Sequence, residues 1–435
     1  MVSKGGQAMA ERTNIFVLGL EDFTAAKLRA LPGAEGCRFL PLLEFGEVKK
    51  RRHYPVGDLL AKASDQLARF PGRPDAIIGY WDLPVSTMVP ILCAEHGLRA
   101  PSLESVLKCE HKYWSRLEQQ AVIAAAVPGF CLVDPFDDDA RASIELDFPF
   151  WLKPIKSFAS YLGFKVDDAG EFEEAIASIR EGIETVAEPF DEVLRRADLP
   201  REIAGIGARQ CIAEEIIGGW QCTVCGYVYE GEAQVYGIVD SVREADSSSF
   251  SHYKYPSSLP QEIQTHLANI SKRVMERIGF DHSPFNIEYF CDLETGTVRL
   301  LEMNARLSES HADLFEKVDG VADLQILVDL ALGREPEFPH RQGRFRCAGK
   351  FFMRRHEDAL VRRIPGETEQ QRLAQAIPGT LVKVHVREGM RLSELPNQDS
   401  YSFEVADLFV GADNEDELVG KSHRAAEMLA FDFAA

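Results

Sequence analysis

The first hundred residues alternate between short apolar runs and segments with helical spacing of apolar positions. The apolar runs have the length of buried strands and lie at residues 14–20, 39–43 and 75–80. Helical spacing is found at residues 25–31, 57–70 and 86–96. Because strands that alternate with helices form a parallel sheet, residues 12–105 are predicted to be a parallel α/β domain. Ligands bind such domains at the carboxyl ends of the strands, where Gly19 and Asp82 lie.

The next stretch presents a lysine at the end of a predicted strand. Residues 102–126 are predicted to be helical, with Ser102 as the cap. The strand at 148–154 carries Lys153 directly before a proline, which holds the lysine in an extended conformation. A loop of small and hydroxylic residues follows at 155–163, and such loops let backbone N–H groups approach a phosphate. Taken alone, Lys153 is better explained as a solvated surface lysine than as a phosphate contact.

The remaining pattern predicts a mixture of helices and antiparallel strands. Predicted helices occupy much of 170–198 and all of 260–278, 324–332 and 422–429. Predicted strands lie at 210–217, 382–386 and 402–410, and a hairpin joins 221–229 to 233–242. Residues 246–258, rich in serine and aromatic residues, are interpreted as a surface loop.

A second hairpin, at residues 284–306, places charged groups on one face. If its turn centres near Thr295, Glu288 faces Glu302, and Asn304 and Arg306 continue on the same side. Like charges that face each other destabilise a hairpin. Two carboxylates and an amide oxygen are, however, the ligands that Mg²⁺ takes together with phosphates. The spacing leaves two interpretations open, a metal site or a hairpin whose carboxylates point into water.

Composition limits the classes of protein that this chain can belong to. A length of 435 residues predicts two or three domains, and 45% hydrophobic with 27% charged residues is ordinary for a soluble globular protein. A formal charge of −21 argues against nucleic acid and anionic membranes as partners. No apolar run reaches the roughly 18 residues of a membrane span. Residues 1–11 lack a signal core and are expected to be a disordered lead, and nine scattered cysteines indicate reduced thiols in a cytoplasmic protein.

The strand-end lysine, the acidic strand at 214–217 and the carboxylate hairpin occur in an order that resembles the ATP-grasp superfamily. The most specific part is Leu301-Glu302-Met303-Asn304-Ala305-Arg306, which resembles the family's Glu-x-Asn-x-Arg strand. The resemblance covers residues 105–335 and is nearest to carboxylate–amine ligases, similar to L-amino-acid ligases, D-alanine–D-alanine ligase and the biotin carboxylase fold. It implies a mixed α/β and α+β fold class, with an N-terminal parallel α/β (pre-ATP-grasp) domain. The implied domains are 12–110, an ATP-grasp domain at 111–335 with a lid at about 145–217, and a C-terminal α+β portion at 336–435.

The resemblance also implies roles for individual residues. Lys112 and Lys153 would contact ATP phosphates, and Ser160 would lie in the closing loop at 156–163. Glu214, Glu215 and Ile217 would form the hinge beside adenine, and Gln221 stands where the family often has a ribose-binding glutamate. Glu288, Glu302 and Asn304 would hold Mg²⁺, and Arg306 would be catalytic, facing the reacting carboxylate. Ser310 and His311 are weaker candidates for contact with the substrate, the alternative being a helix start capped by Ser308.

The implied reaction joins a carboxylate to an amine at the expense of ATP, through an acyl phosphate, with ADP and phosphate released. The expected carboxylate is an amino acid or small peptide, and the expected cofactors are ATP and one or two Mg²⁺ ions, with Mn²⁺ able to substitute. The partners are then small-molecule substrates, and relatives suggest a homodimer. Two alternatives remain open: an enzyme that activates another acid, as biotin carboxylase does, and an ATP-binding sensor or assembly protein without ligase activity.

Departures from the family pattern and other motifs carry less weight. The loop at 156–163 has Gly163 as its one glycine, and Ala305 stands where proline is common. Cys222 and Cys225 form one CxxC on a predicted strand, whose alternation points the thiols to opposite faces, so zinc is not expected. The basic run at 49–52 is read as a solvated loop in preference to an anion site, and residues 252–254 as surface.

Overall fold

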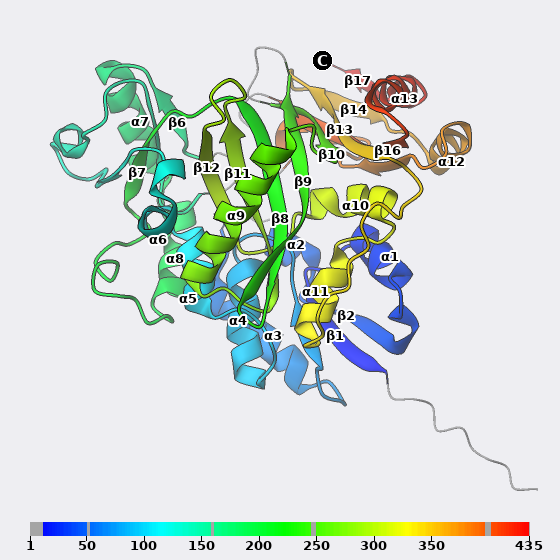
Figure 1. Ribbon diagram of the computed structural model, residues 1–435, viewed down its shortest axis with the longest axis horizontal. Helices are drawn as coiled ribbons and strands as arrows, with labels where there is room; N and C mark the ends of the chain where they lie inside the picture. The colour runs from blue at the N-terminus through cyan, green and yellow to red at the C-terminus, as the bar shows by residue number, and fades with distance from the viewer. Residues whose placement is uncertain (1–11, 50–52, 158–160, 245–248, 396–401, 435) are drawn as a thin grey trace, which may run out of the picture.

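The computed structural model describes residues 12–49, 53–157, 161–244, 249–395 and 402–434 (Figure 1). The expected disordered lead at 1–11 and the predicted loop residue Ser160 lie outside the described residues. None of the described helices is long and apolar enough to cross a membrane.

The N-terminal domain is a parallel sheet with helices around it, as the alternating pattern predicts. Strands β1 (Thr13–Leu18), β2 (Cys37–Leu42) and β3 (Ala76–Ile78) lie in the order β2-β1-β3, and both pairs are parallel. The connecting helices are α1 (Asp22–Ala30), α2 (Phe45–Lys49), α3 (Val56–Ala68) and α4 (Val85–His96). Burial of Ile15, Val17 and Ile77 between these layers explains why the short apolar runs form strands.

The predicted helical stretch at 102–126 is confirmed, but the chain breaks at His111 and so forms two helices. It forms α5 (Leu103–Glu110) and α6 (Lys112–Ile123), and the predicted cap Ser102 accepts a hydrogen bond from the Ser105 N–H at 3.1 Å. His111 leaves the helical conformation (φ −84°, ψ 96°), and its Nδ1 accepts the Trp114 N–H at 3.1 Å. The break therefore places Lys112 in the first turn of α6.

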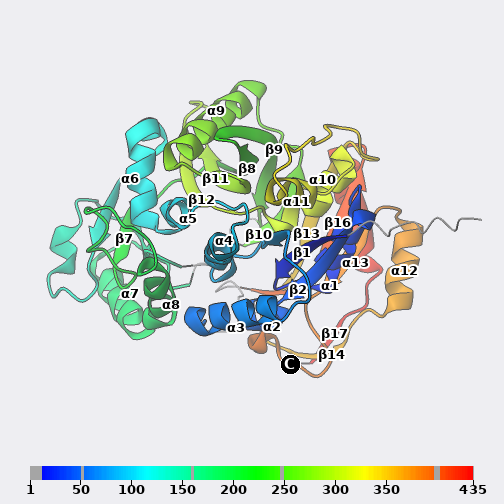
Figure 2. The ribbon, with the colours of Figure 1, turned by 90° about the horizontal axis from the view of Figure 1, so that it is seen from below.

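A small antiparallel sheet forms the lid of the molecule. Its described strands are β4 (Phe130–Val133), β5 (Phe150–Pro154), β6 (Phe164–Val166) and β7 (Cys211–Glu215), in the order β4-β7-β5-β6. Helices α7 (Ala169–Gly182) and α8 (Glu184–Leu194) belong to the same unit, which lies at one end of the molecule in both views (Figures 1 and 2). Strand β4 precedes the expected lid start near residue 145, so the lid sheet draws on residues from both sides of that boundary.

The largest sheet joins the hairpins to the C-terminal strands. Its described strands lie in the order β12-β11-β8-β9-β10-β13-β16-β15, and all neighbouring pairs are antiparallel. Their bounds are β8 (Trp220–Tyr229), β9 (Glu232–Arg243), β10 (Phe250–Tyr255), β11 (Ser283–Cys291), β12 (Val298–Asn304), β13 (Cys347–Arg355), β15 (Leu381–Val384) and β16 (Phe403–Ala412). The two predicted hairpins are confirmed as β8–β9 and β11–β12. The sheet runs without a break across the expected domain boundary at 335/336.

The interpretation of residues 246–258 as a surface loop is wrong for 250–255. This segment is β10, which pairs with β9 on one side and with β13, about a hundred positions later, on the other. Tyr255 is fully buried there. The serine content hid a strand whose pairing partner is remote in the sequence.

Further helices and short strands complete the chain. They are α9 (Gln261–Ile278), α10 (Ala312–Asp319), α11 (Leu324–Ala331), α12 (Glu367–Ala376), α13 (Glu415–Glu427), and the antiparallel pair β14 (Leu360–Arg363) and β17 (Asp432–Ala434). Single 3₁₀ turns are η1 (Ala34–Gly36), η2 (Ala124–Ala126), η3 (Ala140–Ser143), η4 (Glu309–His311) and η5 (Leu392–Glu394). Gly279, with φ of 72°, ends α9 at the predicted residue. The last predicted helix begins earlier than expected, because Asn414 caps it by accepting the Glu417 N–H at 3.0 Å.

Candidate active site

The hairpin of β11 and β12 brings together the two acids that the sequence analysis paired. Glu288 lies directly opposite Glu302, and Asn286 lies opposite Asn304. The register shifts just after this pair, where Tyr289 faces Leu300 and Leu301 is the extra residue. Such a bulge re-aims the side chains beside it. The predicted facing of the two carboxylates is confirmed.

The pKa values of the two facing carboxyl groups are shifted in opposite directions. Burial and the nearby Glu302 raise the pKa of Glu288 to about 7. The pKa of Glu302 is lowered, because Lys112 and Lys153 outweigh the opposing effect of burial. A bound cation would allow both carboxylates to ionise, so this pair suits a metal ion better than it suits an empty site.

An amide network fixes the third candidate ligand. The side-chain nitrogen of Asn304 donates to Oδ1 of Asn286 at 3.0 Å, and Asn286 Nδ2 donates to the backbone oxygen of Arg306 at 2.8 Å. The amide oxygen of Asn304 is therefore the atom that remains for a cation. Two carboxylates and an amide oxygen fit Mg²⁺, which prefers oxygen ligands.

Three lysines surround the acids, and each is paired with a carboxylate of the protein. Lys112 Nζ lies 2.7 Å from Glu302 Oε1 and donates to the Ser157 carbonyl at 3.2 Å. Lys153 pairs with Glu214, and Lys156 pairs with Glu110. Burial lowers the pKa of Lys112, and Glu302 offsets this only in part. Each of these three lysines is therefore neutralised by a carboxylate of the protein itself.

Arg116 ties the lid to the large sheet, and the sequence analysis missed it. Its Nε lies 2.6 Å from Glu214 Oε1, and its two terminal nitrogens donate to the carbonyls of Leu300 and Leu301 at 2.9 and 2.8 Å. Although burial opposes ionisation, Arg116 and Lys153 lower the pKa of Glu214 to about 2. A signal was present, since Arg116 lies four residues after Lys112 and therefore on the same face of α6.

The expected hinge residues are divided between two places. Glu215 is exposed and is bonded twice to Gly129, the residue before β4. Its N–H donates to the Gly129 carbonyl at 2.9 Å, and its carboxylate accepts the Gly129 N–H at 3.1 Å. Ile217 lies past the end of β7 and is half-buried. Gln221 lies at the acids, with Nε2 3.3 Å from Glu288 and Oε1 accepting two hydrogen bonds from Arg243 at 3.1 and 2.8 Å.

Arg306 reaches across to the N-terminal domain. Its Nε and Nη2 donate to the two carboxylate oxygens of Asp82 at 2.7 and 2.8 Å. Although burial works against ionisation, Arg306 and Lys49 hold the pKa of Asp82 well below its usual range. Asp82 follows β3 at the carboxyl end of the parallel sheet, where the sequence analysis placed it.

The two weaker substrate candidates lie in η4, directly after the metal strand. Ser310 Oγ accepts a hydrogen bond from Lys350 Nζ at 3.1 Å. His311 is 2% exposed and packs edge-on against Tyr253, and burial together with Lys350 and Arg306 lowers its pKa to about 3. It is therefore a neutral, packed group. The helix start proposed as the alternative is present, because η4 leads directly into α10, but Ser308 makes no side-chain capping bond.

Two further sequence features can be placed. Cys222 and Cys225 pack in different hydrophobic clusters, as the strand alternation predicts. Lys49 is not a solvated loop residue, because its Nζ lies 5.0 Å from the centre of the Trp81 ring and its charge is felt by Asp82. A groove of about 490 Å³ lies apart from these charges, between α6 and β4, lined by Leu117 and Phe130 among others.

Comparison with known proteins agrees with this arrangement. Residues 146–312 match the family model described as an ATP-grasp domain. The L-amino acid ligase of Bacillus licheniformis has a similar structure, with a TM-score of 0.71 and 16% identity over 98% of this chain and 100% of that one. The biotin carboxylase of Campylobacter jejuni has a TM-score of 0.65 and 14% identity over 98% of this chain and 93% of that one.

A third similar structure is the N5-carboxyaminoimidazole synthase of Aspergillus clavatus, in complex with ADP and 5-aminoimidazole ribonucleotide. It has a TM-score of 0.65 and 13% identity over 96% of this chain and 99% of that one. No curated protein sequence is matched by the chain. The family match and the shared fold confirm the resemblance drawn from the Glu-x-Asn-x-Arg strand: the chain contains an ATP-grasp domain and has the ATP-grasp fold, with a parallel sheet before it.

Proposed function

We propose that the protein is an ATP-dependent carboxylate–amine ligase, which forms an amide through an acyl phosphate. The observation that carries the proposal is the position of Arg306. It lies two residues past the end of β12, the strand that carries Glu302 and Asn304, and is fixed by Asp82 of another domain. A protein that only binds ATP has no chemical use for a guanidinium held beside two metal-ligand acids, whereas a ligase needs one for the reacting carboxylate.

Glu288, Glu302 and Asn304 would hold Mg²⁺, one or two ions, with Mn²⁺ able to replace them. When bound, the ion neutralises charge on the phosphate oxygens. Within the protein, Gln221 supports this assignment by holding Glu288 from the side. A cation bound between Glu288 and Glu302 would explain why the hairpin tolerates this like-charge pair at its centre.

The lysines would bind the phosphates of ATP by exchanging partners. Lys112 would leave Glu302 and Lys153 would leave Glu214, each taking a phosphate oxygen in place of a carboxylate. Glu214 keeps its bond to Arg116 throughout, so its charge is not stranded when Lys153 departs. The adenine would contact the backbone after β7 at Ile217, because the ladder already pairs Glu214 with β4 and β5.

The chemistry then requires two displacements. A carboxylate oxygen of the first substrate attacks the γ-phosphorus and ADP leaves, which gives the acyl phosphate. The amine nitrogen of the second substrate attacks the acyl carbon, phosphate leaves, and the nitrogen loses a proton. Arg306 would orient the carboxylate and offset the negative charge that gathers as two anions approach. The lid would exclude water from the activated intermediate.

The proposed substrates are small molecules, with an amino acid or small peptide as the carboxylate. Similarity to an L-amino acid ligase over the whole of both chains supports this class. Similarity to a biotin carboxylase supports bicarbonate as the alternative acid. The nine free cysteines support a cytoplasmic location. A homodimer is also proposed, and sedimentation analysis would test it.

A phosphate-release screen tests the proposal. The protein is mixed with ATP, Mg²⁺ and pairs drawn from the twenty amino acids, with bicarbonate as an additional acid, and product masses are read out. Release that depends on a pair of substrates, with a product equal to their sum minus water, supports the ligase. Binding of ATP without release in any mixture would favour a nucleotide sensor and contradict the proposal.

A further inference from the structure

A second group of charged side chains lies on the same face of the large sheet as the metal acids. Residues opposite each other on neighbouring strands share a face, as do residues two apart on one strand. Glu288 is opposite Thr223, and Thr223 is opposite Val239. Two residues further along β9, Ser241 is opposite Tyr253, which is itself opposite Lys350. The same relation places Lys383 opposite Asp407 on that face. The charge of Glu288 and the charge of Asp407 both act on Tyr253, which lies between the two groups.

The N-terminal domain closes over this second group through its first strand-to-helix loop. Lys383 Nζ lies 2.8 Å from Oε1 of Glu21 and 3.0 Å from Oε1 of Glu309. Phe23, in the first turn of α1, stacks on Phe409 of β16 with ring centres 5.6 Å apart. The side chains of the ion pair remain 11–16% exposed, so the pair is largely enclosed.

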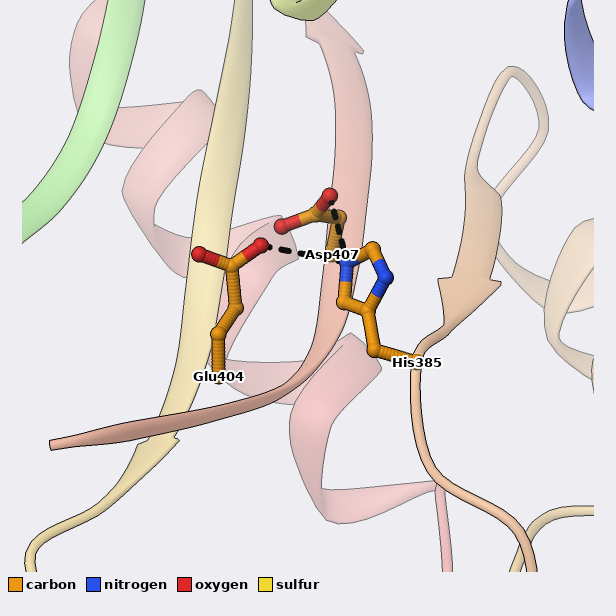
Figure 3. A group of neighbouring side chains, drawn as sticks. All are labelled: His385, Glu404 and Asp407. Carbon is orange, nitrogen blue, oxygen red and sulfur yellow. Dashed lines mark hydrogen bonds and ion pairs between the residues drawn. The ribbon is translucent and has the colours of Figure 1, made fainter. Parts of the chain in front are cut away.

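His385 joins Asp407 and Glu404 in this group (Figure 3). Its Nε2 lies 2.9 Å from Asp407 Oδ2 and 3.1 Å from Glu404 Oε1, and its other ring nitrogen points away from both carboxylates. A histidine with two acids is a set that can hold a metal ion. Here, however, Lys350 lies 2.9 Å from Asp407 and Arg354 lies 3.3 Å from Glu404, and these positive charges oppose a metal cation. We therefore read His385 as a cation itself.

The two groups meet at Glu309, three residues after Arg306. The charges of Asp82, Arg306, Glu309 and Glu21 all act on Lys49, so these four side chains share one electrostatic field. Tyr80 lies near Glu21 and Glu309, since both charges act on its hydroxyl.

We propose that Glu21, Glu309, Lys383 and His385 bind the amine substrate, and that this substrate is dipolar, an amine that carries its own carboxylate. The inference rests on the proposed ligase function and adds the class of the second substrate. Glu21 and Glu309 lie at the end of the group nearer Arg306, where the ammonium group of the substrate must arrive. His385 lies at the other end, where it would bind the carboxylate of the substrate.

The bonding capacity of these residues is sufficient. Lys383 uses two of its three N–H donors on Glu21 and Glu309, and the third remains for a carboxylate. Each acid has about four lone-pair positions, so accepting Lys383 leaves room for a substrate ammonium. The same residues could instead hold the N-terminal domain against the large sheet, as a latch. The substrate comparison below distinguishes such a latch from substrate binding.

The experiment compares amino acids with their amides as the amine substrate. An amino-acid amide has no carboxylate to be activated, so it reports on the amine position alone. With a fixed carboxylate substrate and ATP, the wild-type enzyme is expected to use the amino acid with a kcat/KM about tenfold or more above that of its amide, the usual effect of one charge-assisted hydrogen bond.

Two variants test the assignment of the residues. Lys383→Met and His385→Gln are expected to raise the KM for the amino acid about tenfold, to leave the KM for ATP unchanged, and to remove the discrimination against the amide. Matched controls are Lys165→Met on β6 and His266→Gln on α9, which change exposed residues outside this group. Should Lys383→Met fail to fold, His385→Gln carries the test alone, because its side chain is 25% exposed.

Each outcome has a definite meaning. Wild-type enzyme that uses amide and acid equally well, or variants that keep the wild-type discrimination, overturns the inference while leaving the ligase function standing. Variants that lose thermal stability but keep the discrimination would assign these residues to a latch. Absence of phosphate release from the wild-type enzyme with every pair would contradict the ligase function itself.

Discussion

Asp82 and Arg306 form a two-pronged ion pair that joins the N-terminal domain to the segment directly after β12, with N···O distances of 2.7 and 2.8 Å. Both oxygens of the carboxylate and two nitrogens of the guanidinium are used, so the arginine is fixed in position and in orientation. The side chains remain 28% and 18% exposed, which leaves Arg306 accessible to a substrate.

Asp82→Asn is expected to lower kcat by about ten- to a hundredfold while leaving the KM for ATP unchanged. The amide keeps one acceptor but loses the charge and the second prong, so Arg306 is oriented less firmly. Steady-state kinetics at saturating ATP measure the effect, and Asp82→Glu is expected to recover part of it. The control is Asp58→Asn, an exposed carboxylate of α3. A fall in thermal stability without a fall in kcat would make Asp82 purely structural.

Glu302→Ala is expected to abolish turnover and leave the fold intact. The substitution removes an anionic metal ligand and frees Lys112, without creating a large cavity in a core. Phosphate release and circular dichroism measure the two effects. Glu294→Ala, in the exposed turn of the same hairpin, is the matched control and should retain full activity. An active Glu302→Ala enzyme would refute the metal assignment.

Arg116→Met is expected to destabilise the protein by about 3–5 kcal/mol, because it leaves Glu214 buried with one cation fewer. The side chains of both residues are about 95% enclosed, at 4% and 5% exposure. Urea unfolding followed by fluorescence measures the loss. Adding Glu214→Gln should restore part of it, since the stranded charge is then removed. Arg69→Met, a control on an exposed ion pair, should leave stability unchanged. Equal destabilisation by Arg116→Met and Arg69→Met would contradict the role given to Arg116.

The stability supplied by His385 is expected to depend on pH. Burial works against its charge, but hydrogen bonds and charges of Asp407 and Glu404 raise the pKa from 6.5 to about 9. The raised value means that the folded state binds the proton more tightly, so the contribution is complete below about pH 6.5 and is lost as pH rises through 9. It amounts to at most about 3 kcal/mol.

The comparison is between the wild-type protein and His385→Gln in thermal unfolding from pH 6 to pH 10. The gap in Tm should be largest near pH 6 and should close towards pH 10. The neighbouring cations Lys350, Arg354 and Lys383 stay charged over most of this range, so they do not produce the same profile. A gap that stays constant with pH would mean that His385 is not charged in the folded protein.

The parts of the fold that the sequence predicted are those coded by local pattern. The parallel sheet follows from apolar runs separated by helices, and the pairing of Glu288 with Glu302 follows from strand alternation and a recognisable turn. The remaining site contacts depend on residues that are remote in the chain. Arg116 and Glu214 are 98 positions apart, and Asp82 and Arg306 are 224 apart. No local pattern specifies such pairs.

The break at His111 and the unpredicted strand β10 have the same origin. The break at His111 depends on the Lys112 N–H, which donates to the carbonyl of Ile155 in the lid at 3.1 Å. Strand β10 depends on β13, which is supplied by the C-terminal part of the chain. In both cases tertiary contacts override the local preference of the segment.

The continuity of the large sheet across residue 335 limits how the protein can be divided. A chain cut there would lose β13, β15 and β16, and β10 would become an uncovered edge with unpaired backbone N–H and C=O groups. Edges of this kind template aggregation. A fragment that contained every residue of the metal hairpin and the lid would therefore be expected to precipitate, and the last hundred residues are required to keep the ATP-grasp module in solution.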